Sequence, residues 1–487
     1  MGKVSISKEI EKALISFIFA FAFISLFSSS TSWMYDNVEY LDADVFSVVG
    51  KYWSQGYLPY IDLWDQKGPI IHFANAIGYG LMNSRIGVFW VQVISLTITF
   101  FYTIKLLNEV FHSRVLLFFL LISALGLLND YSSAGNNVEE YLLPLLTMSF
   151  YYMYKWAHDQ QDKSHNHPIQ YAFVYGMAFG VSAFTRLTNA TGLCGGVFVI
   201  FVLLLYHMQW RNVLQNIALF FAGAGCIVLP FVAYFYWHGG LNEMWYGTII
   251  YNFEYAQTAP KLDPFSLNQT LYLFKSSLNG ILLLFVSLFL IKLPIKRRIG
   301  FLWLFVSLSS LLWLMTGNGF HHYFIITYPF LSICVNEMYL LYKDNLINKP
   351  SLFAFNWVVF LIFVFASSYE VYGAFNKMIT KNSNLVFYDE VRRDIPIKEL
   401  DSFVAYNVSP YIYLYLDIKP CCRFFAYQDP QISFSHSLKE KVMREYRGKR
   451  AKWILMGYNS PNIERLLAND YLLRKRYKNG MKLFQHK

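Results

Sequence analysis

The sequence predicts an all-α polytopic membrane bundle of about eleven transmembrane helices, followed by a small C-terminal α/β soluble domain. Hydrophobic residues make up 55% of the 487 positions and charged residues only 15%. A soluble domain would carry about 45–50% and 25%. Apolar stretches close to the roughly 20 residues that cross a hydrocarbon core also recur along the chain. The composition and the repeated long apolar runs are therefore those of a membrane protein.

The apolar runs give the expected spans. Clear examples are Ala13 to Phe27, Val115 to Leu128 and Leu352 to Ala366. The predicted spans are 13–30, 86–106, 115–129, 139–156, 170–187, 190–207, 215–237, 276–293, 299–316, 322–342 and 352–369. With a long first outer loop at 31–85 they form a membrane domain over 1–369, and residues 370–487 form the soluble domain.

The distribution of Lys and Arg predicts the orientation. With a cytoplasmic N-terminus, the inner segments hold 14 of these residues and the outer segments before the tail hold 6. The positive-inside rule therefore favours this orientation. An odd number of spans then puts the tail outside, although it carries 21 of the 41 basic residues, because long segments translocate largely regardless of charge. A basic tail in that position suits anionic membrane lipids or an acidic glycan as partners, and its position argues against nucleic acid as a partner.

The outer segments also have predicted local structure. In the first outer loop, Ile70 to Met82 predicts a short amphipathic helix along the membrane interface. In the tail, strands are predicted at 403–406, 423–427, 452–456 and 481–485, and helices at 438–446 and 463–472. The five cysteines are scattered, so their spacing predicts no zinc, haem or disulfide framework.

Polar and ionisable residues gather on one side of the predicted membrane. Such residues are costly near a bilayer, so their positions indicate function. A transporter would place charges near the midplane at broken helices, where this chain has few candidates. The residues on the outer side are Asp36, Glu39, Asp42, Asp44, Asp62, Asp65, Lys67, Glu139, Glu140, Arg186, Asn189, Asn252, Glu254, His321 and His322.

The first outer loop reads YDNVEYLDADVFSVVGKYWSQGYLPYIDLWDQKGP, and it resembles the start of the bacterial GT-C transferases. This group contains protein O-mannosyltransferases and the lipid A aminoarabinose transferase. Its pattern is an acidic residue after the first span, an aromatic residue, a helix ending in Gly, a Pro-aromatic-x-Asp segment, and Lys-x-Pro or Lys-Pro. The matching positions are Asp42, Phe46, Gly56, Pro59 to Asp62, and Lys67 to Pro69.

The resemblance continues over most of the chain. Further matches are Glu139-Glu140-Tyr141 with Pro144, the Arg186 to Asn189 turn, and Gly319 to Tyr323 with Pro329. One position departs from the pattern, because the group often has Asp-Glu where this chain has Asp42-Ala43. The register of the catalytic carboxylate is therefore open between Asp42 and Asp44.

The resemblance implies a GT-C-like enzyme of the bacterial plasma membrane. It would transfer a sugar from a polyprenyl phosphate to a glycan, lipid or protein acceptor, with inversion at the anomeric carbon. A carboxylate can take the proton of the acceptor hydroxyl, and cations can stabilise the leaving phosphate. The implied roles are general base for Asp42 or Asp44; phosphate binding for Lys67, Arg186, His321 and His322; and substrate binding for Asp62, Asp65, Glu139, Glu140, Asn189 and Asn252.

Each of these roles has a simpler alternative. Asp42 and Asp44 could hold a divalent cation, although the resembling enzymes need no metal. Lys67 could extend to phospholipid heads, and Glu139 and Glu140 could cap the fourth span. For the whole chain, the alternatives are a transporter or flippase of lipid-linked glycans, an O-antigen-type polymerase, and a scaffolding membrane protein.

Overall fold

The computed structural model describes residues 2–36, 39–111, 115–128, 134–159, 166–258, 266–316, 320–379, 384–448, 451–458 and 460–487. Arg114, Lys163 and Lys261, which are among the basic residues counted for the orientation, lie outside these ranges, as does Gly319 of the matching pattern. The chain divides into two compact units, each built from separated segments. Unit 1 comprises 1–28, 92–231 and 260–376, and unit 2 comprises 29–91, 232–259 and 377–487. The first outer loop, which the sequence analysis grouped with the bundle, thus clusters with the tail.

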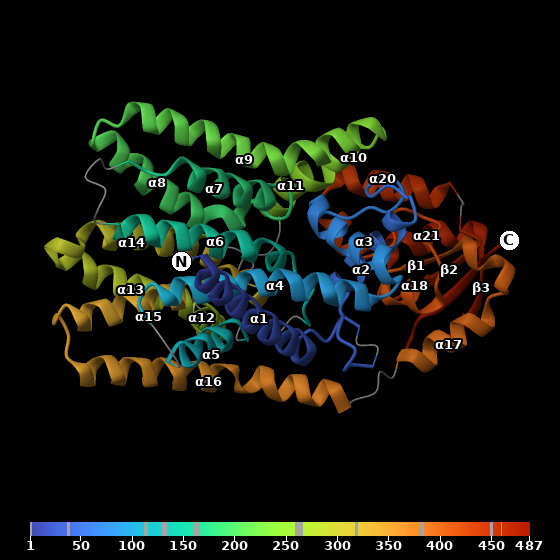
Figure 1. The fold of residues 1–487 in the computed structure, drawn as a ribbon. Helices are drawn as coiled ribbons and strands as arrows, with labels where there is room; N and C mark the ends of the chain where they lie inside the picture. The colour runs from blue at the N-terminus through green and yellow to red at the C-terminus, as the bar shows by residue number, and fades with distance from the viewer. Residues whose placement is uncertain are drawn as a thin grey trace. The chain divides into compact units, whose positions relative to one another are not determined.

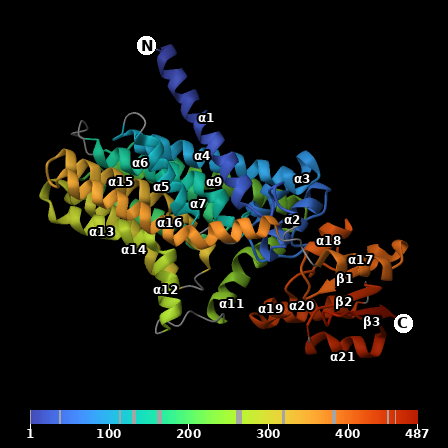
Figure 2. The same ribbon diagram turned by 90° about the horizontal axis from the view of Figure 1, so that it is seen from below.

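Unit 1 is a helix bundle. Its helices, some of which continue into unit 2, are α1 (Gly2–Phe27), α4 (Arg85–Asn108), α5 (Val115–Leu128), α6 (Val138–His158), α7 (Ile169–Ala183), η1 (Leu187–Ala190), α8 (Thr191–Tyr206), α9 (Trp210–Trp237), α12 (Leu267–Ser276), α13 (Leu278–Lys292), η3 (Pro294–Lys296), α14 (Arg297–Thr316), η4 (His321–Thr327), α15 (Tyr328–Lys343) and α16 (Lys349–Ile379). Helix α14 packs between α8 and α13 (Figure 1). The side chains of α5 and α16 share one apolar core, and these two helices lie side by side (Figures 1 and 2).

Several of these helices can cross a membrane, so the chain is a multi-pass membrane protein. Within the described residues, 7 helices are long and apolar enough, or 8 if the bent pair α12 and α13 forms one span. Helices α5 and α7 are apolar but shorter. Each predicted span therefore corresponds to a helix, but the count of about eleven crossings is not confirmed. Helix α9 exposes Leu214, Phe221 and Leu229, the kind of surface that lipid chains cover.

Glycines let α7 and α9 approach closely. A Cβ added at Gly176 would lie 1.9 Å from the backbone oxygen of Phe220, and one at Gly223 would lie 2.0 Å from that of Phe173. Small residues at such contacts are typical of membrane helices, because association there depends on close packing.

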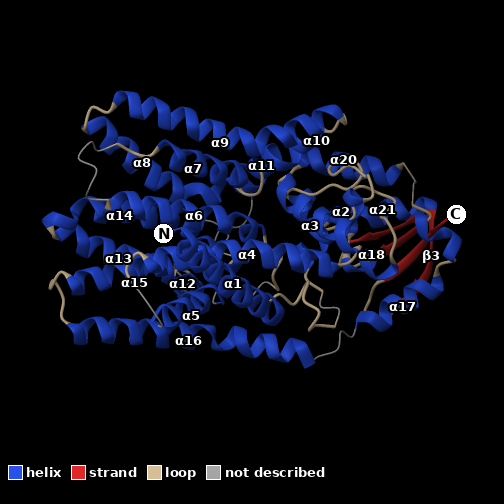
Figure 3. Ribbon diagram, in the orientation of Figure 1, coloured by secondary structure: helices blue, strands red, loops and turns tan. Residues whose placement is uncertain are grey.

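Unit 2 contains a four-stranded sheet with short helices around it (Figure 3). Its elements are α2 (Leu41–Ser54), α3 (Pro69–Met82), α10 (Leu241–Trp245), η2 (Tyr246–Ile250), α11 (Tyr251–Thr258), α17 (Asn384–Asp394), η5 (Ile397–Ser402), β1 (Phe403–Tyr406), α18 (Tyr411–Leu416), α19 (Gln428–Ser433), α20 (His436–Arg447), β2 (Trp453–Met456), α21 (Pro461–Asp470), β3 (Tyr471–Arg476) and β4 (Lys482–His486). The strand order is β1-β2-β4-β3, and only the β1–β2 pair is parallel. Strands β1 and β2 are buried along their whole length, although β1 is at the edge of the sheet.

The predicted α/β tail is present, with two local corrections. The segment 423–427 is not a strand, because its backbone bonds elsewhere: the N–H of Arg423 donates to Glu445, and its carbonyl accepts from Trp64. The predicted helix 463–472 ends at Asp470, because residues from Tyr471 onward pair with β4. In the first outer loop, the helix predicted at 70–82 is confirmed as α3.

Candidate functional site

Asp42 and Asp44 lie in the first turn of α2, and their carboxyl groups have different surroundings. Asp44 is buried, and its Oδ2 accepts a hydrogen bond from the backbone N–H of Tyr40 at 3.0 Å. The nearby hydroxyl of Ser409 also favours the ionised form of Asp44 and so acts to lower its pKa. The half-buried Asp42 carboxylate makes no hydrogen bond to any group in the described ranges. Asp44 therefore supports the start of the helix, whereas the Asp42 carboxylate is available to a ligand.

A second carboxylate, Asp65, organises the end of the loop that leads into α3. It is 4% exposed, and its Oδ2 lies 3.4 Å from Nε2 of the fully buried His72. The same oxygen accepts a hydrogen bond from the backbone N–H of Lys67 at 3.3 Å. The Tyr60 hydroxyl donates to the carbonyl of Lys67 at 2.8 Å. The backbone of Lys67 is thus held on both sides.

The charges in this cluster influence one another. Burial raises the pKa of Asp42 above its usual value; the positive charge of Lys67 opposes this effect, and the negative charge of Asp65 adds to it. Burial also raises the pKa of Asp44 well above its usual value, and the charge of Glu39 adds to this. Burial disfavours the carboxylate of Asp65 too, but the neighbouring His72 ring and the charge of Lys67 outweigh this effect and lower the pKa of Asp65. Lys67 therefore favours the ionised form of both Asp42 and Asp65.

Two other predicted substrate-binding residues of unit 2 have side chains that hydrogen-bond to backbone groups. Asp62 accepts a hydrogen bond from the N–H of Leu58 at 2.7 Å and so closes a loop turn. The Asn252 side chain, in α11, donates to the carbonyl of Gln66 at 2.8 Å and to the carbonyls of Gly247 and Thr248 in the preceding η2. These contacts hold the loop that carries Asp65 and Lys67 in place.

A separate polar cluster in unit 1 surrounds Arg186, just before η1. Its guanidinium carbon lies 3.1 Å from the ring centroid of Tyr323, and Nη1 lies 3.7 Å from Oε1 of Glu139. The Asn189 side chain donates to the same Glu139 oxygen at 3.2 Å. The buried Nη1 has no hydrogen-bond acceptor among the groups that the structure describes. An anionic oxygen of a ligand could accept a hydrogen bond from this Nη1.

The three remaining predicted residues of unit 1 have different surroundings. Glu140 forms a capping box with Asn137 and also accepts a hydrogen bond from Gln92 at 2.7 Å, so the capping role is the one its contacts support. His322 lies beside Tyr323, with 4.6 Å between ring centroids, and so belongs to the Arg186 cluster. His321 instead contacts α12, with 2.9 Å between its Nδ1 and the hydroxyl oxygen of Ser276.

Three residues of these clusters were not predicted as site residues from the sequence. His72 lies in an apolar helix and has no motif around it, and Tyr323 was noticed only as part of the His321-His322 motif. Tyr427 fell inside the wrongly predicted strand. Its burial and the charges of Asp42, Asp44 and Asp65 raise its pKa, so the phenol stays neutral near these three carboxyl groups.

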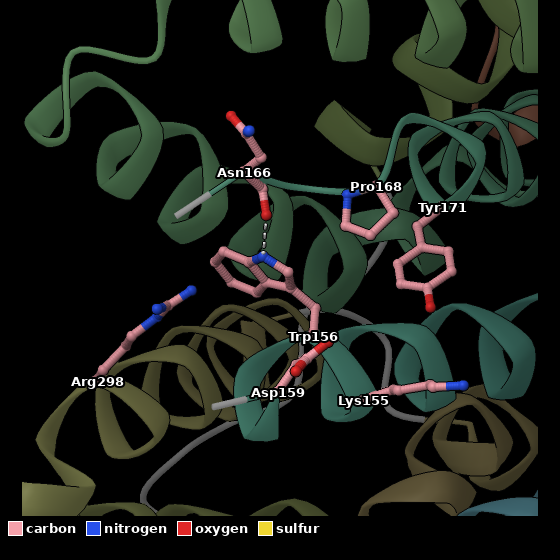
Figure 4. A pocket seen from close by; sticks show the side chains of 7 residues that line it. All are labelled: Lys155, Trp156, Asp159, Asn166, Pro168, Tyr171 and Arg298. Carbon is pink, nitrogen blue, oxygen red and sulfur yellow. Dashed lines mark hydrogen bonds between the residues drawn. The ribbon is translucent and has the colours of Figure 1, made fainter. Parts of the chain in front are cut away.

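Two cavities lie away from both clusters. A cavity of about 30 Å³ lies between α6, the start of α7 and the start of α14. Figure 4 shows Trp156 in this cavity, bonded to the carbonyl of Asn166, and the Arg298 guanidinium carbon lies 4.1 Å from the Trp156 ring centroid. A second cavity, of about 130 Å³, is mostly apolar and lies among α7, α8 and α9.

The fold is shared with solved membrane glycosyltransferases. No family model and no curated protein sequence match the chain. The structure of ArnT from Cupriavidus metallidurans bound to undecaprenyl phosphate is similar at 12% identity, over 99% of this chain and 98% of that one, with a TM-score of 0.59. The apo structure of ArnT gives 11% identity, 98% and 97% coverage, and a TM-score of 0.60.

A third similar structure comes from an archaeon. The Archaeoglobus fulgidus oligosaccharyltransferase, tethered with an acceptor peptide, is 12% identical over 98% of this chain and 74% of that one, with a TM-score of 0.51. The chain therefore has the GT-C fold over nearly its whole length, as the first outer loop predicted.

Proposed function

We propose that this protein is a membrane glycosyltransferase. It transfers a sugar from a polyprenyl phosphate to a hydroxyl group of an envelope glycan, lipid or protein on the outer face of the membrane. The shared GT-C fold supports this class of reaction, because ArnT was solved with undecaprenyl phosphate and the oligosaccharyltransferase with an acceptor peptide. The observation that carries the proposal is the Asp42 carboxylate, which has no hydrogen bond within the described residues and lies in the field of Lys67.

The reaction is a single displacement with Asp42 as general base. The carboxylate takes the proton of the acceptor hydroxyl while the acceptor oxygen forms a bond to the anomeric carbon. The bond between that carbon and the phosphate oxygen breaks on the opposite side, and the polyprenyl phosphate leaves with the electron pair. One displacement inverts the anomeric configuration.

Cations stabilise the leaving phosphate. We assign this role to Lys67, whose backbone is fixed by Asp65 and Tyr60. Arg186 of unit 1 is a separate candidate for a contact to an anionic ligand, because its buried Nη1 has no hydrogen-bond acceptor among the described groups. A charge-assisted hydrogen bond of this kind contributes about 1.5–3 kcal/mol. Lys67→Ala is therefore expected to raise the donor concentration needed for half-maximal rate by at least about tenfold.

Reconstitution of the full-length protein in liposomes tests this proposal. The donors are undecaprenyl phosphates carrying a hexose, an aminopentose or an N-acetylhexosamine, and the acceptor is the envelope glycolipid fraction of cells that lack the protein. The expected result is sugar transfer from one donor with release of undecaprenyl phosphate. Asp42→Asn keeps the size of the side chain but cannot accept the proton, so the rate should fall about a hundredfold or more.

Asp44→Asn is the matched control, because Asn can still accept the hydrogen bond from Tyr40. It should retain transfer. If only Asp44→Asn loses transfer, the general base is Asp44 instead of Asp42, and the proposed reaction still holds. If the purified protein moves intact lipid-linked sugar across the bilayer without transferring it, the transporter reading replaces this proposal.

A further inference from the structure

One segment of the tail, Arg423 to Gln431, is fastened to the loop around Asp65 at both ends, within unit 2. The backbone N–H of Trp64 donates to the carbonyl of Arg423 at 2.9 Å. At the other end, the Gln431 side chain donates to the Gln66 side chain at 2.8 Å. Asp65 lies between the two attachment points in the loop, so both ends of the segment are held beside this carboxylate.

Tyr427 lies in the middle of this segment, in an unusual backbone conformation. Its φ is +53°, a left-handed value that costs free energy for a residue with a side chain. The following residues hold it there: the Gln428 side chain donates to the carbonyls of Ala405 and Phe424, and the N–H of Asp429 donates to Asn407. The position of the Tyr427 ring is thus set by well-bonded neighbours.

The hydroxyl of Tyr427 is buried and has no hydrogen-bond partner within the described residues. A buried polar group without a partner costs about 1–3 kcal/mol. It is unexpected in a segment where the side chains of Arg423, Gln428, Asp429 and Gln431 are all hydrogen-bonded. The hydroxyl lies in the field of Asp42, Asp44 and Asp65. A neutral phenol there can donate a hydrogen bond to a ligand oxygen.

We propose that Tyr427 is a sugar-binding residue, which the tail contributes to the carboxylate cluster of the first outer loop. The carboxylates accept hydrogen bonds from sugar hydroxyls. The phenol donates a hydrogen bond to a sugar oxygen, which an ionised carboxylate cannot do because it has no proton to donate. Asp42 and Asp65, whose ionised forms Lys67 favours, disfavour a phosphate beside this hydroxyl, so the ligand there is the sugar itself, and the phosphate is left to Lys67. This inference rests on the proposed function, and the sugar can belong to the donor or to the acceptor.

The test is Tyr427→Phe, which removes the hydroxyl and keeps the ring. The control is Tyr458→Phe, which removes an exposed hydroxyl in the same unit. Binding of undecaprenyl phosphate, which carries no sugar, should be unchanged in both variants. For the donor that the wild type uses, Tyr427→Phe should weaken binding or raise the KM for the glycolipid acceptor by about 3- to 15-fold. The first result assigns the contact to the donor sugar and the second to the acceptor sugar.

The outcomes separate the two proposals. Unchanged donor binding and unchanged acceptor KM in Tyr427→Phe overturn the sugar contact, while transfer by the wild type keeps the proposed function. Equal weakening of undecaprenyl phosphate and donor also overturns it, because the loss is then not specific to the sugar. If the wild type transfers no sugar, the proposed function fails and this inference falls with it.

Discussion

At the scale of residues, the central feature is that Asp42 and Asp44 differ although they are two positions apart. Side chains at i and i+2 of a helix do not face each other, so this Asp-x-Asp pair is poorly arranged to hold one cation between its carboxylates. Asp44 accepts a backbone hydrogen bond, and the charge of Lys67 acts on Asp42. The pair thus separates into a structural carboxyl group and a candidate base.

The pH dependence of transfer should reveal the coupling between Asp42 and Lys67. Burial raises the pKa of Asp42, so the acidic limb of the rate profile should lie above the usual value of about 4. The charge of Lys67 opposes this rise, and its removal in Lys67→Ala should shift the limb to higher pH. The control Lys439→Ala removes an exposed charge and should leave the limb in place. Superimposable limbs for Lys67→Ala and the wild type would contradict the coupling.

The stability of Asp44→Asn should depend on pH in a defined direction. The pKa of Asp44 is raised well above its usual value, mainly by burial, so folding favours its protonated form. This contribution to stability is complete below about pH 4 and is lost as pH rises through the raised pKa. Asn stays neutral, so the melting temperature of the variant minus that of the wild type should grow as the pH rises above about 4. A constant or falling difference would show that Asp44 is stabilising when charged.

At the scale of elements, glycine positions decide how closely α7 and α9 pack. Gly223 and Gly225 are two residues apart on α9, but only Gly223 faces the backbone of α7. A Cβ at Gly225 would meet only the flexible side chain of Leu229, at 3.5 Å. The two glycines therefore provide a matched comparison on one helix.

Gly223→Ala should destabilise the bundle by about 1–3 kcal/mol, because its Cβ would overlap the carbonyl oxygen of Phe173 and force the helices apart. Gly225→Ala should be neutral or slightly stabilising, because Ala is the better helix former. Thermal unfolding of both purified variants in the same detergent compares them. Equal melting temperatures would argue against close α7–α9 packing.

At the scale of the whole molecule, the proposed chemistry requires that unit 2 lie outside the cytoplasm. The excess of Lys and Arg in the inner segments predicts a cytoplasmic N-terminus, and an odd number of crossings then exports the tail. A reporter that is active only after translocation, fused after Lys487, should be active. Activity of a reporter that works only in the cytoplasm would overturn both the number of crossings and the catalytic face.

The sequence by itself determined the class of this protein. Long apolar runs are sufficient to place membrane helices, because a bilayer demands length and apolarity whatever the neighbouring helices are. The motif from Asp42 to Pro69 pointed to the GT-C fold, which the structural likeness confirms. Short strands such as 403–406 and 452–456 were also visible, because buried strands are apolar throughout.

Only the tertiary structure distinguished the residues within the candidate site. Whether an aspartate caps a helix or stays unbonded depends on groups that come near it only after folding, such as the backbone N–H of Tyr40 for Asp44 and the charge of Lys67 for Asp42. The segment 423–427 has a strand-like composition, but it bonds to Trp64 and Glu445, far away in sequence, and so cannot join the sheet. Tyr427 meets the carboxylates of the first outer loop across more than three hundred residues of sequence, and local pattern carries no information about such a meeting.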